Sequence, residues 1–262
     1  MKRFITLFLM PFASMATFAA EAVPAPSAKD LATQLSGLQQ DGSSLVRLKL
    51  AVSPGGGGGK YAVQLQIKSR STAASTALVY QVIWPKERAG ESVLLTKTGN
   101  QSASGVRFTP PESEERLKSS QMDDPLFGSD LAYADVVENH FDWSNQTIVG
   151  TEMIGRANCQ ILESKPGKSG SIYSGVRSWI DLRRMVPLRI EKYQGSSAVV
   201  RRIETLDVVK DDKGRNVPAN LLISSPQRGS STKLEGSKLI HGVKFSDQEF
   251  TAQGLRVLPG AR

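Results

Sequence analysis

Apolar and polar residues alternate along much of this sequence, and this period of two constrains the fold more than any other feature. Val46, Leu48 and Leu50 alternate with Arg47 and Lys49. Because successive side chains of a strand point to opposite faces, each such run predicts a strand with one apolar face. Strands are expected at about 46–50, 61–67, 78–84, 92–97, 105–108, 146–153, 158–164, 171–181, 186–193, 198–209, 216–224, 231–240 and 248–252.

Short segments rich in Gly, Lys, Asp and Ser separate these runs. Gly55 to Gly59 is a flexible turn between two of them, and Lys165-Pro166-Gly167 and Asp211-Asp212-Lys213-Gly214 follow the same pattern. Serial strands joined by short turns are typical of an antiparallel meander. We therefore expect a mainly β fold of the α+β type, with one strongly curved antiparallel sheet of about ten strands.

One helix is expected before the strands, over about 28–39. Ser27 followed by Asp30 is a capping signal at its start. Apolar residues then repeat at helical spacing and give the helix one apolar face: Leu31, Leu35 and Leu38.

The region from about Pro110 to Val137 interrupts the strands. Thr109-Pro110-Pro111-Glu112 predicts the start of a short helix, with Glu114 and Lys118 one turn apart. Ser129 and Asp130 can cap a second short helix near 129–138, in which three apolar residues share a face: Tyr133, Val136 and Val137. This region is the natural lid over the concave face of a curved sheet.

The N-terminus has the layout of a secretory signal peptide. Lys2 and Arg3 precede an apolar run, and Ala20-Glu21-Ala22 fits the small-residue cleavage pattern. We expect a signal peptide over 1–22, cleavage near Ala20 to Ala22, and a single domain over 23–262. No cysteine follows the signal to carry a lipid anchor, and no later run is long and apolar enough to cross a membrane. The expected location is the periplasm, with the protein in soluble form.

The charge balance is basic. The formal net charge of +8 falls to +6 if residues 1–20 are removed, because Lys2 and Arg3 leave and no acid does. A basic protein can favour anionic partners such as lipid head groups or nucleic acid. The charges are scattered, however, which fits simple solubility, and an exported protein rarely meets nucleic acid. No nucleic-acid partner is expected.

Residues that could carry chemistry are few. His140 and His241 do not stand at metal-ligand spacing, and the sequence has no nucleophile elbow and no P-loop lysine. Asp211-Asp212 reads as a solvated turn, and Asp123-Asp124 as a helix cap rather than a binding loop. Cys159, the only cysteine, is expected to be a buried structural thiol. We therefore expect no enzyme activity, no cofactor and no metal.

Large apolar residues on the alternating strands predict the wall of an apolar cleft. Short helices cannot fill a large concave face, so a cavity would remain between them and the sheet. The alternative is that the same residues form a packed core. Val176 and Trp179 point to opposite faces if their strand is regular, so both are included. The expected cleft residues are Tyr61, Val63, Leu65, Leu78, Tyr80, Val82, Trp84, Tyr133, Val136, Val137, Val176 and Trp179.

The stretch Asp124-Pro125-Leu126-Phe127-Gly128-Ser129-Asp130-Leu131-Ala132-Tyr133-Ala134-Asp135-Val136 resembles the central signature of the LolA-like outer-membrane lipoprotein-sorting family. Other features of that family follow in the same order, and the similarity covers about residues 30–256. They are Val149-Gly150-Thr151-Glu152 with Gly155, Cys159 to Glu163, Val176 to Asp181, Met185 to Glu191, Ser231 to Leu234 and Phe245 to Thr251.

The resemblance implies an incomplete antiparallel barrel whose concave face is covered by helices, with acyl chains bound between them. Well-known members carry lipoproteins from an inner-membrane transporter to an outer-membrane acceptor, and the wider family includes proteins found alongside envelope export pumps. The implied function is a periplasmic carrier or binder of lipid or lipoprotein acyl chains. Periplasmic sensors share the fold, so a sensing or protein-interaction module without a carried ligand is the alternative. The resemblance is to the broad family rather than to the dedicated carrier, which leaves the cargo open.

Overall fold

The computed structural model describes residues 26–40, 42–99, 101–167, 170–195 and 198–257. The expected signal peptide and its cleavage site lie outside these residues. Within them, no helix is long and apolar enough to span a membrane.

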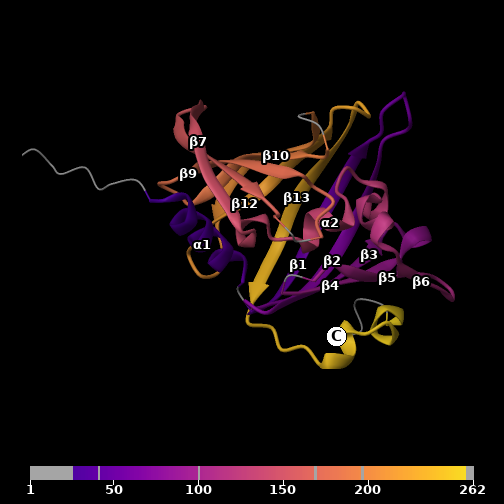
Figure 1. Ribbon diagram of the computed structural model, residues 1–262. Helices are drawn as coiled ribbons and strands as arrows, with labels where there is room; N and C mark the ends of the chain where they lie inside the picture. Colours follow the sequence, from indigo (N-terminus) through magenta and orange to yellow (C-terminus); the bar gives the residue numbers. More distant parts are fainter. Residues whose placement is uncertain (1–25, 41, 100, 168–169, 196–197, 258–262) are drawn as a thin grey trace, which may run out of the picture.

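One curved sheet makes up most of the molecule (Figure 1). It has thirteen strands in the order β6-β5-β4-β3-β2-β1-β13-β12-β11-β10-β9-β8-β7, and all paired neighbours are antiparallel. The strands are β1 (Gly42–Ser53), β2 (Tyr61–Ser71), β3 (Ser75–Trp84), β4 (Ser92–Thr98), β5 (Ser104–Thr109), β6 (Ser113–Leu117), β7 (Asn145–Ile154), β8 (Ala157–Lys165), β9 (Gly175–Asp181), β10 (Val186–Tyr193), β11 (Val199–Lys210), β12 (Asn216–Ser225) and β13 (Ser230–His241). The expected antiparallel meander is confirmed, as an open sheet of thirteen strands where a total of about ten was expected.

The order of the strands determines where the rest of the chain must lie. The chain enters the sheet at β1, in its middle, and runs strand by strand to the edge at β6. It resumes at β7, which is the opposite edge, and returns strand by strand to β13 beside β1. Residues 118–144, called the central segment below, therefore connect the two edges. Figure 1 shows this segment, with helix α2 (Tyr133–Val137), crossing the concave side of the sheet.

Helix α1 (Ala28–Gln39) matches the expected range and cap, because the Ser27 hydroxyl accepts a hydrogen bond from the backbone N–H of Asp30. Its apolar face packs on the β7–β9 end of the sheet (Figure 1). Leu31 and Leu35 are buried there against Leu162 and Ile180. The helix is short, so its stability depends on this packing more than on helix propensity.

The main hydrophobic core lies between the sheet and the central segment. Inward residues of β1–β4 supply one part of it, and Val176 and Ile223 contribute from the other half of the sheet. Leu126, Tyr133 and Val137 of the central segment pack into the same cluster. The concave face is thus filled by apolar side chains over much of its area.

The outer face of β3–β5 is covered by the C-terminal part of the chain (Figure 1). Leu255 is buried against Val79, Leu94 and Phe108. The strand expected at 248–252 was wrong: the structure has a 3₁₀ helix, η5 (Asp247–Phe250), at this place. The segment stands on the sheet rather than beside an edge strand, so its backbone has no ladder to join.

The expected helix after Thr109 was also wrong. Residues 113–117 form β6, which pairs with β5 to make a hairpin. Arg107 stands opposite Glu115 in this hairpin and forms an ion pair with it, and Leu117 is buried. Pairing with the sheet edge and burial of Leu117 outweigh the local helical spacing of Glu114 and Lys118.

The second central helix exists but starts later than expected. It begins at Tyr133, where the Asp135 carboxylate accepts a hydrogen bond from the Ala132 backbone N–H at 2.7 Å. The expected capping residues have other partners. The Ser129 hydroxyl donates to the Leu126 carbonyl, and Asp130 reaches the sheet.

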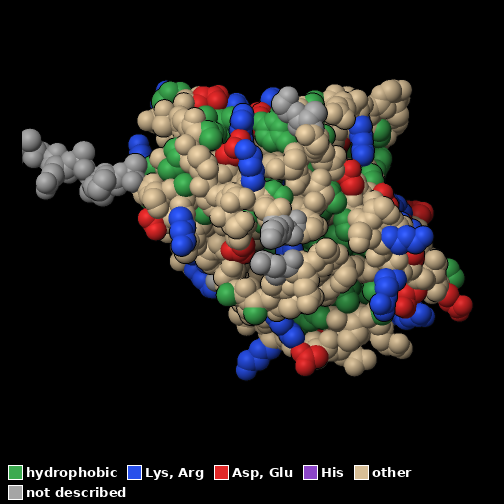
Figure 2. Space-filling model, viewed as in Figure 1, with side chains coloured by type: hydrophobic (Ala, Val, Ile, Leu, Met, Phe, Trp, Pro, Cys, Tyr) green, Lys and Arg blue, Asp and Glu red, His purple; other side chains and the backbone are tan. Residues whose placement is uncertain are grey.

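Charged side chains are interspersed on the surface. Figure 2 shows Lys and Arg among Asp and Glu on the visible face, with apolar side chains between them. Many of the cations have acidic partners, as in the pairs of Arg177 with Glu163 and Arg202 with Glu191. This arrangement agrees with the expectation of scattered charge.

Candidate functional site

Two buried carboxylates fasten the central segment to the sheet. Asp130 accepts hydrogen bonds from the hydroxyls of Ser230 and Thr232, the latter at 2.8 Å, at the start of β13. The backbone N–H of Asp130 donates to the Thr232 hydroxyl at 2.9 Å. Hydroxyl groups thus satisfy this carboxylate and fix the loop that precedes α2.

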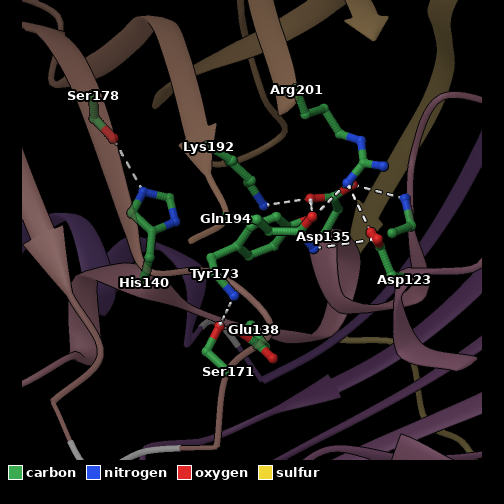
Figure 3. Close-up of polar contacts among 11 residues, drawn as sticks. Asp123, Asp135, Glu138, His140, Ser171, Tyr173, Ser178, Lys192, Gln194 and Arg201 are labelled. Carbon is green, nitrogen blue, oxygen red and sulfur yellow. Dashed lines mark hydrogen bonds and ion pairs between the residues drawn. The ribbon is translucent and has the colours of Figure 1, made fainter. Parts of the chain in front are cut away.

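The second carboxylate, Asp135 on α2, is held by charged groups (Figure 3). Its side chain is 0% exposed and lies 2.7 Å from the Lys192 ammonium and 3.0 Å from the Arg201 guanidinium. The Tyr173 hydroxyl donates to it at 2.6 Å. Lys192 lies on β10, Arg201 on β11 and Tyr173 just before β9, so two strands and the residues leading into a third converge on one residue of the central segment.

Contacts around this group extend the network toward the surface. Asp123, half-exposed at the end of η2 (Ser119–Asp123), lies 3.7 Å from the Arg201 guanidinium and accepts a hydrogen bond from Gln194 at 3.2 Å. Arg201 also donates to the Tyr173 hydroxyl, and the Lys192 ammonium lies 4.9 Å from the centre of the Tyr173 ring. Asp123 therefore takes part in the network and does not serve as the helix cap that the sequence predicted.

The electrostatics of the network favour ionised groups. Burial alone would raise the pKa of Asp135, but Lys192 and Arg201 outweigh burial and hold that pKa below its usual value. Burial opposes the charge of Arg201, yet Asp135 raises the Arg201 pKa overall. Burial raises the pKa of Tyr173, so its phenol stays protonated and donates.

Two further polar residues follow α2. His140 is buried, and its Nε2 lies 3.1 Å from the Ser178 hydroxyl of β9 (Figure 3). Burial, with the nearby Lys192 charge, lowers the pKa of His140 to about 3, so the ring is neutral at pH 7. Glu138 accepts a hydrogen bond from Ser171 at 2.6 Å, and burial raises its pKa. The expectation that His140 is a structural histidine agrees with this geometry.

A half-open pocket of about 570 Å³ lies where the central segment leaves α2. The β2–β3 turn, the end of β4, the residues after α2 and the β8–β9 loop surround it. Its lining residues are Thr72, Ala73, Ala74, Ser75, Thr76, Lys97, Gly99, Val137, Asn139, Asp142, Trp143, Ser144, Asn145, Pro166 and Gly167.

This pocket has apolar and polar parts. Val137 and Trp143 line it and also belong to the main hydrophobic core. Its two charged residues have partners, since the Lys97 ammonium donates to the Gln101 carbonyl at 2.8 Å and Asp142 accepts from Asn139 at 3.0 Å. Hydroxyl and amide groups make up most of the remaining rim. The arrangement suits an amphiphilic ligand with an apolar part directed toward the core.

A smaller pocket of about 170 Å³ shares several residues with the first one. The two pockets adjoin, because both are lined by Thr72, Thr76, Val137, Asn139 and Asp142. Leu78 and Val136 line the smaller pocket.

The structure brings most of the expected cleft residues together in the main core. Those buried in that cluster are Val63, Leu65, Leu78, Tyr80, Val82, Tyr133, Val137 and Val176, and Val136 packs against it. Of these, Leu78, Val136 and Val137 reach a pocket, whereas the others are covered by packed side chains.

Three expected cleft residues lie elsewhere. Trp84 is 50% exposed at the end of β3, and Tyr61 is 37% exposed and donates its hydroxyl to the Gly128 carbonyl at 2.9 Å. Trp179 lies in a separate cluster with Cys159 and Leu188, while Val176 faces the main core. The two residues of β9 thus point to opposite faces, as the alternation of a regular strand requires. Cys159 is buried, and burial raises its pKa, as expected of a structural thiol.

Asp211, Asp212 and His241 form the group of acidic and histidine residues whose ligand atoms are close enough to hold a cation, among the residues that the structure describes. Internal partners already occupy them. Asp211 accepts from the Arg215 guanidinium at 2.7 Å, and Asp212 accepts from the His241 backbone N–H at 2.9 Å. The Arg215 guanidinium also lies 3.1 Å from His241 Nε2, and its positive charge opposes a metal ion there. These contacts stabilise the turn, in which the Asp211 side chain is 0% exposed, so only Asp212 is solvated as the sequence predicted.

Sequence reasoning missed Lys192, Arg201 and Tyr173. One signal for them was available in the run from Val186 to Tyr193. Ile190 packs against the core, and Lys192 stands two positions later on the same face of the strand, where an apolar residue would be expected. A charged residue at an inward position needs a buried partner of opposite sign, and the sequence does not say which acid supplies it.

Comparison with known proteins agrees with this architecture. A protein-family model described as an uncharacterized protein matches residues 76–257. No curated protein matches the sequence. A structure of a DUF1329 family protein from Desulfovibrio piger has a TM-score of 0.80 at 20% identity, covering 87% of this chain and 97% of that one.

Two other solved structures have a similar fold. A domain from Vibrio parahaemolyticus assigned to outer membrane lipoprotein sorting has a TM-score of 0.78 at 17% identity, covering 88% of this chain and 98% of that one. A LolA superfamily protein from Nitrosomonas europaea has a TM-score of 0.71 at 16% identity, covering 88% of this chain and 100% of that one. Since the family model spans well over half of the sequence, the chain belongs to that family of uncharacterized proteins, and its fold is the LolA-like fold.

Proposed function

We propose that this protein is an exported, periplasmic binder or carrier of acyl chains, taken from a lipid or a lipoprotein. The LolA-like fold supports this proposal, because it places a large apolar concave face under a covering segment. Binding and release need no chemical step. An acyl chain moved from water to an apolar surface gains about 0.8 kcal/mol per buried methylene.

The observation that carries the proposal is the continuity between the larger pocket and the core. Val137 and Trp143 line the pocket on one side and pack in the main core on the other. A chain that enters the 570 Å³ pocket therefore meets apolar side chains that lead beneath the central segment. This volume lies within the range of about 300–1,000 Å³ that is common for small-molecule sites.

A long chain would need more space than the pocket offers. The inward residues of β2 and β3, such as Val63 and Val82, are fully buried against other side chains. We infer that the central segment moves aside when an acyl chain extends along them. The partners that fit this mechanism are an inner-membrane transporter or export pump as donor and an outer-membrane site as acceptor.

The decisive experiment has two arms. The first is mass spectrometry of organic extracts of the protein purified from its native cell envelope, where we expect acyl lipids or acylated peptides at near-stoichiometric amounts. The second measures binding of a fluorescent fatty acid to the wild type and to the Ala74→Trp variant. Ala74 is exposed and lines the larger pocket, so an indole there fills the space without disturbing the core.

The matched control is Gln227→Trp, which adds the same side chain to an exposed turn outside the lining of this pocket. We expect Ala74→Trp to weaken binding at least about tenfold, which is about 1.4 kcal/mol, and Gln227→Trp to leave it unchanged. Equal affinities of the two variants for the fatty acid would show that it binds outside this pocket. Absence of acyl material in the extract, together with no binding of the fatty acid, would refute the proposal.

A second candidate function rests on the filled core. Because the central segment packs tightly on the concave face, the fold can also serve as a periplasmic sensing or protein-interaction module that carries no ligand. The two functions differ in the first arm of the experiment, since an interaction module would yield an extract free of acyl chains.

A further inference from the structure

The network around Asp135 joins two acids of the central segment, Asp135 and the more distant Asp123, to residues on the sheet side. Lys192, Arg201 and Tyr173 all belong to β9–β11 or the residue run leading into them, and each directs a donor at the Asp135 carboxylate. The side chains of Lys192 and Arg201 are each only 4% exposed. On the sheet side, two cations and one phenol thus surround the position of a single carboxylate (Figure 3).

The two cations of this network, Lys192 and Arg201, have few anionic or hydrogen-bonding partners besides Asp135. The Nε of Arg201 is buried and has no hydrogen-bond partner within the described part of the chain. Asp123 lies at 3.7 Å from the guanidinium, which is longer than a hydrogen bond, and it is partly exposed. The carboxylate of Glu138, near Lys192, is held by Ser171. Two buried cations therefore depend chiefly on Asp135.

Movement of the central segment would take this carboxylate away. Asp135 belongs to α2, and α2 packs on the inward wall that an acyl chain would occupy. Two buried cations without an anion are strongly unfavourable, because neither the protein interior nor a neighbouring apolar chain replaces their hydration. A ligand that brings its own anion would remove this penalty, and a ligand with a neutral head group would not.

We propose that Asp135 acts as a built-in substitute for a ligand anion, and that Lys192, Arg201 and Tyr173 receive the carboxylate or phosphate of an anionic amphiphile when the central segment moves. This inference rests on the proposed acyl-chain binding and adds the class of head group. Without a ligand, these three residues hold the central segment on the sheet through Asp135. With a ligand, they favour an anionic head group.

The test compares Asp135→Asn with Asp130→Asn. Both variants neutralise a buried carboxylate that fastens the central segment, but Asp130 is held by the hydroxyls of Ser230 and Thr232, whereas Asp135 is held by two cations. Both variants should therefore loosen the central segment. Only Asp135→Asn also leaves Lys192 and Arg201 without their anionic partner. The probes are palmitate and phosphatidylglycerol as anionic amphiphiles, monopalmitoylglycerol as the neutral one, and inorganic phosphate alone.

The quantity compared is the ratio of the affinity for palmitate or phosphatidylglycerol to the affinity for monopalmitoylglycerol. We expect this ratio to be at least about tenfold higher in Asp135→Asn than in the wild type, because charge-assisted hydrogen bonds are about twice as strong as neutral ones. Asp130→Asn should leave this ratio as in the wild type. Adding Lys192→Met and Arg201→Met to Asp135→Asn should abolish the preference. Tight binding of phosphate alone would identify a free anion as the ligand and overturn the amphiphile assignment.

A second measurement covers the case in which Asp135→Asn does not fold. Hydrogen exchange of the wild type, with and without each probe, reports whether residues 133–137 lose protection. Anionic amphiphiles should increase exchange there, and monopalmitoylglycerol at equal occupancy should do so less. Binding of all amphiphiles with equal affinity in every variant, or equal exchange for both head groups, would refute the anion site while leaving acyl-chain binding intact. No binding of any amphiphile would refute the proposed function itself.

Discussion

Asp130 and Asp135, in one short stretch of the central segment, bind different strands of the sheet. Asp130 accepts from Thr232 on β13 at 2.8 Å, and Asp135 lies 2.7 Å from Lys192 on β10. Both belong to the stretch that resembles the LolA-like signature, so these two acids of that stretch have a structural role that needs no contact with a ligand. They attach a covering segment to the concave face, one through hydroxyl groups and the other through an ion pair.

Removing the Asp135 side chain should cost far more stability than removing an exposed acid. Asp135→Ala leaves Lys192 and Arg201 buried without their main anion, and breaking a buried pair in this way typically costs about 3–5 kcal/mol. Asp247→Ala is the control, because Asp247 also pairs with an arginine but its side chain is 96% exposed. Urea denaturation at pH 7 measures both. Similar free energies of unfolding for the two variants would show that the buried network contributes little.

Stability should decrease as the pH falls below about 6.5 because of His140. Burial lowers the pKa of His140 from 6.5 to about 3 in the folded protein, so the unfolded chain binds more protons between these values. The free energy of unfolding therefore falls with decreasing pH in this window, by at most about 1.4 kcal/mol per unit from this residue. Glu138, whose pKa is raised by burial, acts with the opposite sign.

The variant His140→Gln isolates the histidine contribution. It keeps a group that can bond with Ser178 and removes the titration, so its pH dependence between 4.5 and 6.5 should be flatter than that of the wild type. Denaturation series at several pH values supply the comparison. Parallel curves for the two proteins would show that His140 is not the titrating group.

The sequence predicted local structure well where the signal was local. The alternation of apolar residues located nearly all strands, and the Ser27–Asp30 capping signal located α1 correctly. Errors arose where tertiary contacts decide. Residues 113–117 have helical spacing of charges but join the edge of the sheet, and 248–252 resemble a strand but lie on the outer face where no strand edge is available.

The candidate site was predictable only in part. Alternation identified the inward wall, including Val63, Leu65 and Val82, but it could not show whether the wall is open or covered. The pocket is formed by four segments that are distant in sequence, and its rim is polar. No single run of residues therefore predicted it. The partners of Asp135 were hidden for the same reason, because Lys192 and Arg201 meet it only after the sheet has curved around the central segment.

Two aromatic residues of β3 should respond differently to truncation. Tyr80 is buried in the main core, so Tyr80→Ala should cost about 3–5 kcal/mol through the cavity that it leaves. Trp84 is half-exposed, and Trp84→Ala should cost less than about 1 kcal/mol. Thermal and urea denaturation of both variants test this, with fatty-acid binding measured on the same samples. A large loss of stability for Trp84→Ala would mean that its ring packs against a neighbour in solution.

The last prediction concerns Gly128, in the stretch that resembles the family signature. Gly128 has a φ of +81°, and a Cβ added there would clash with the Tyr61 hydroxyl, which donates to the Gly128 carbonyl. Gly155 has a comparable φ of +59° with open space around it. Both Gly→Ala substitutions carry the strain of a left-handed backbone, and only Gly128→Ala adds the clash.

Gly128→Ala should therefore destabilise the protein more than Gly155→Ala, by about 1–3 kcal/mol, the usual cost of overpacking. The Tyr61→Phe variant removes the clashing oxygen, so the extra cost of Gly128→Ala should shrink in that background. A double-mutant cycle with urea denaturation gives the coupling free energy between the two positions. If the cycle shows no coupling, Tyr61 does not restrict this loop, and the clash is relieved by movement of the central segment instead.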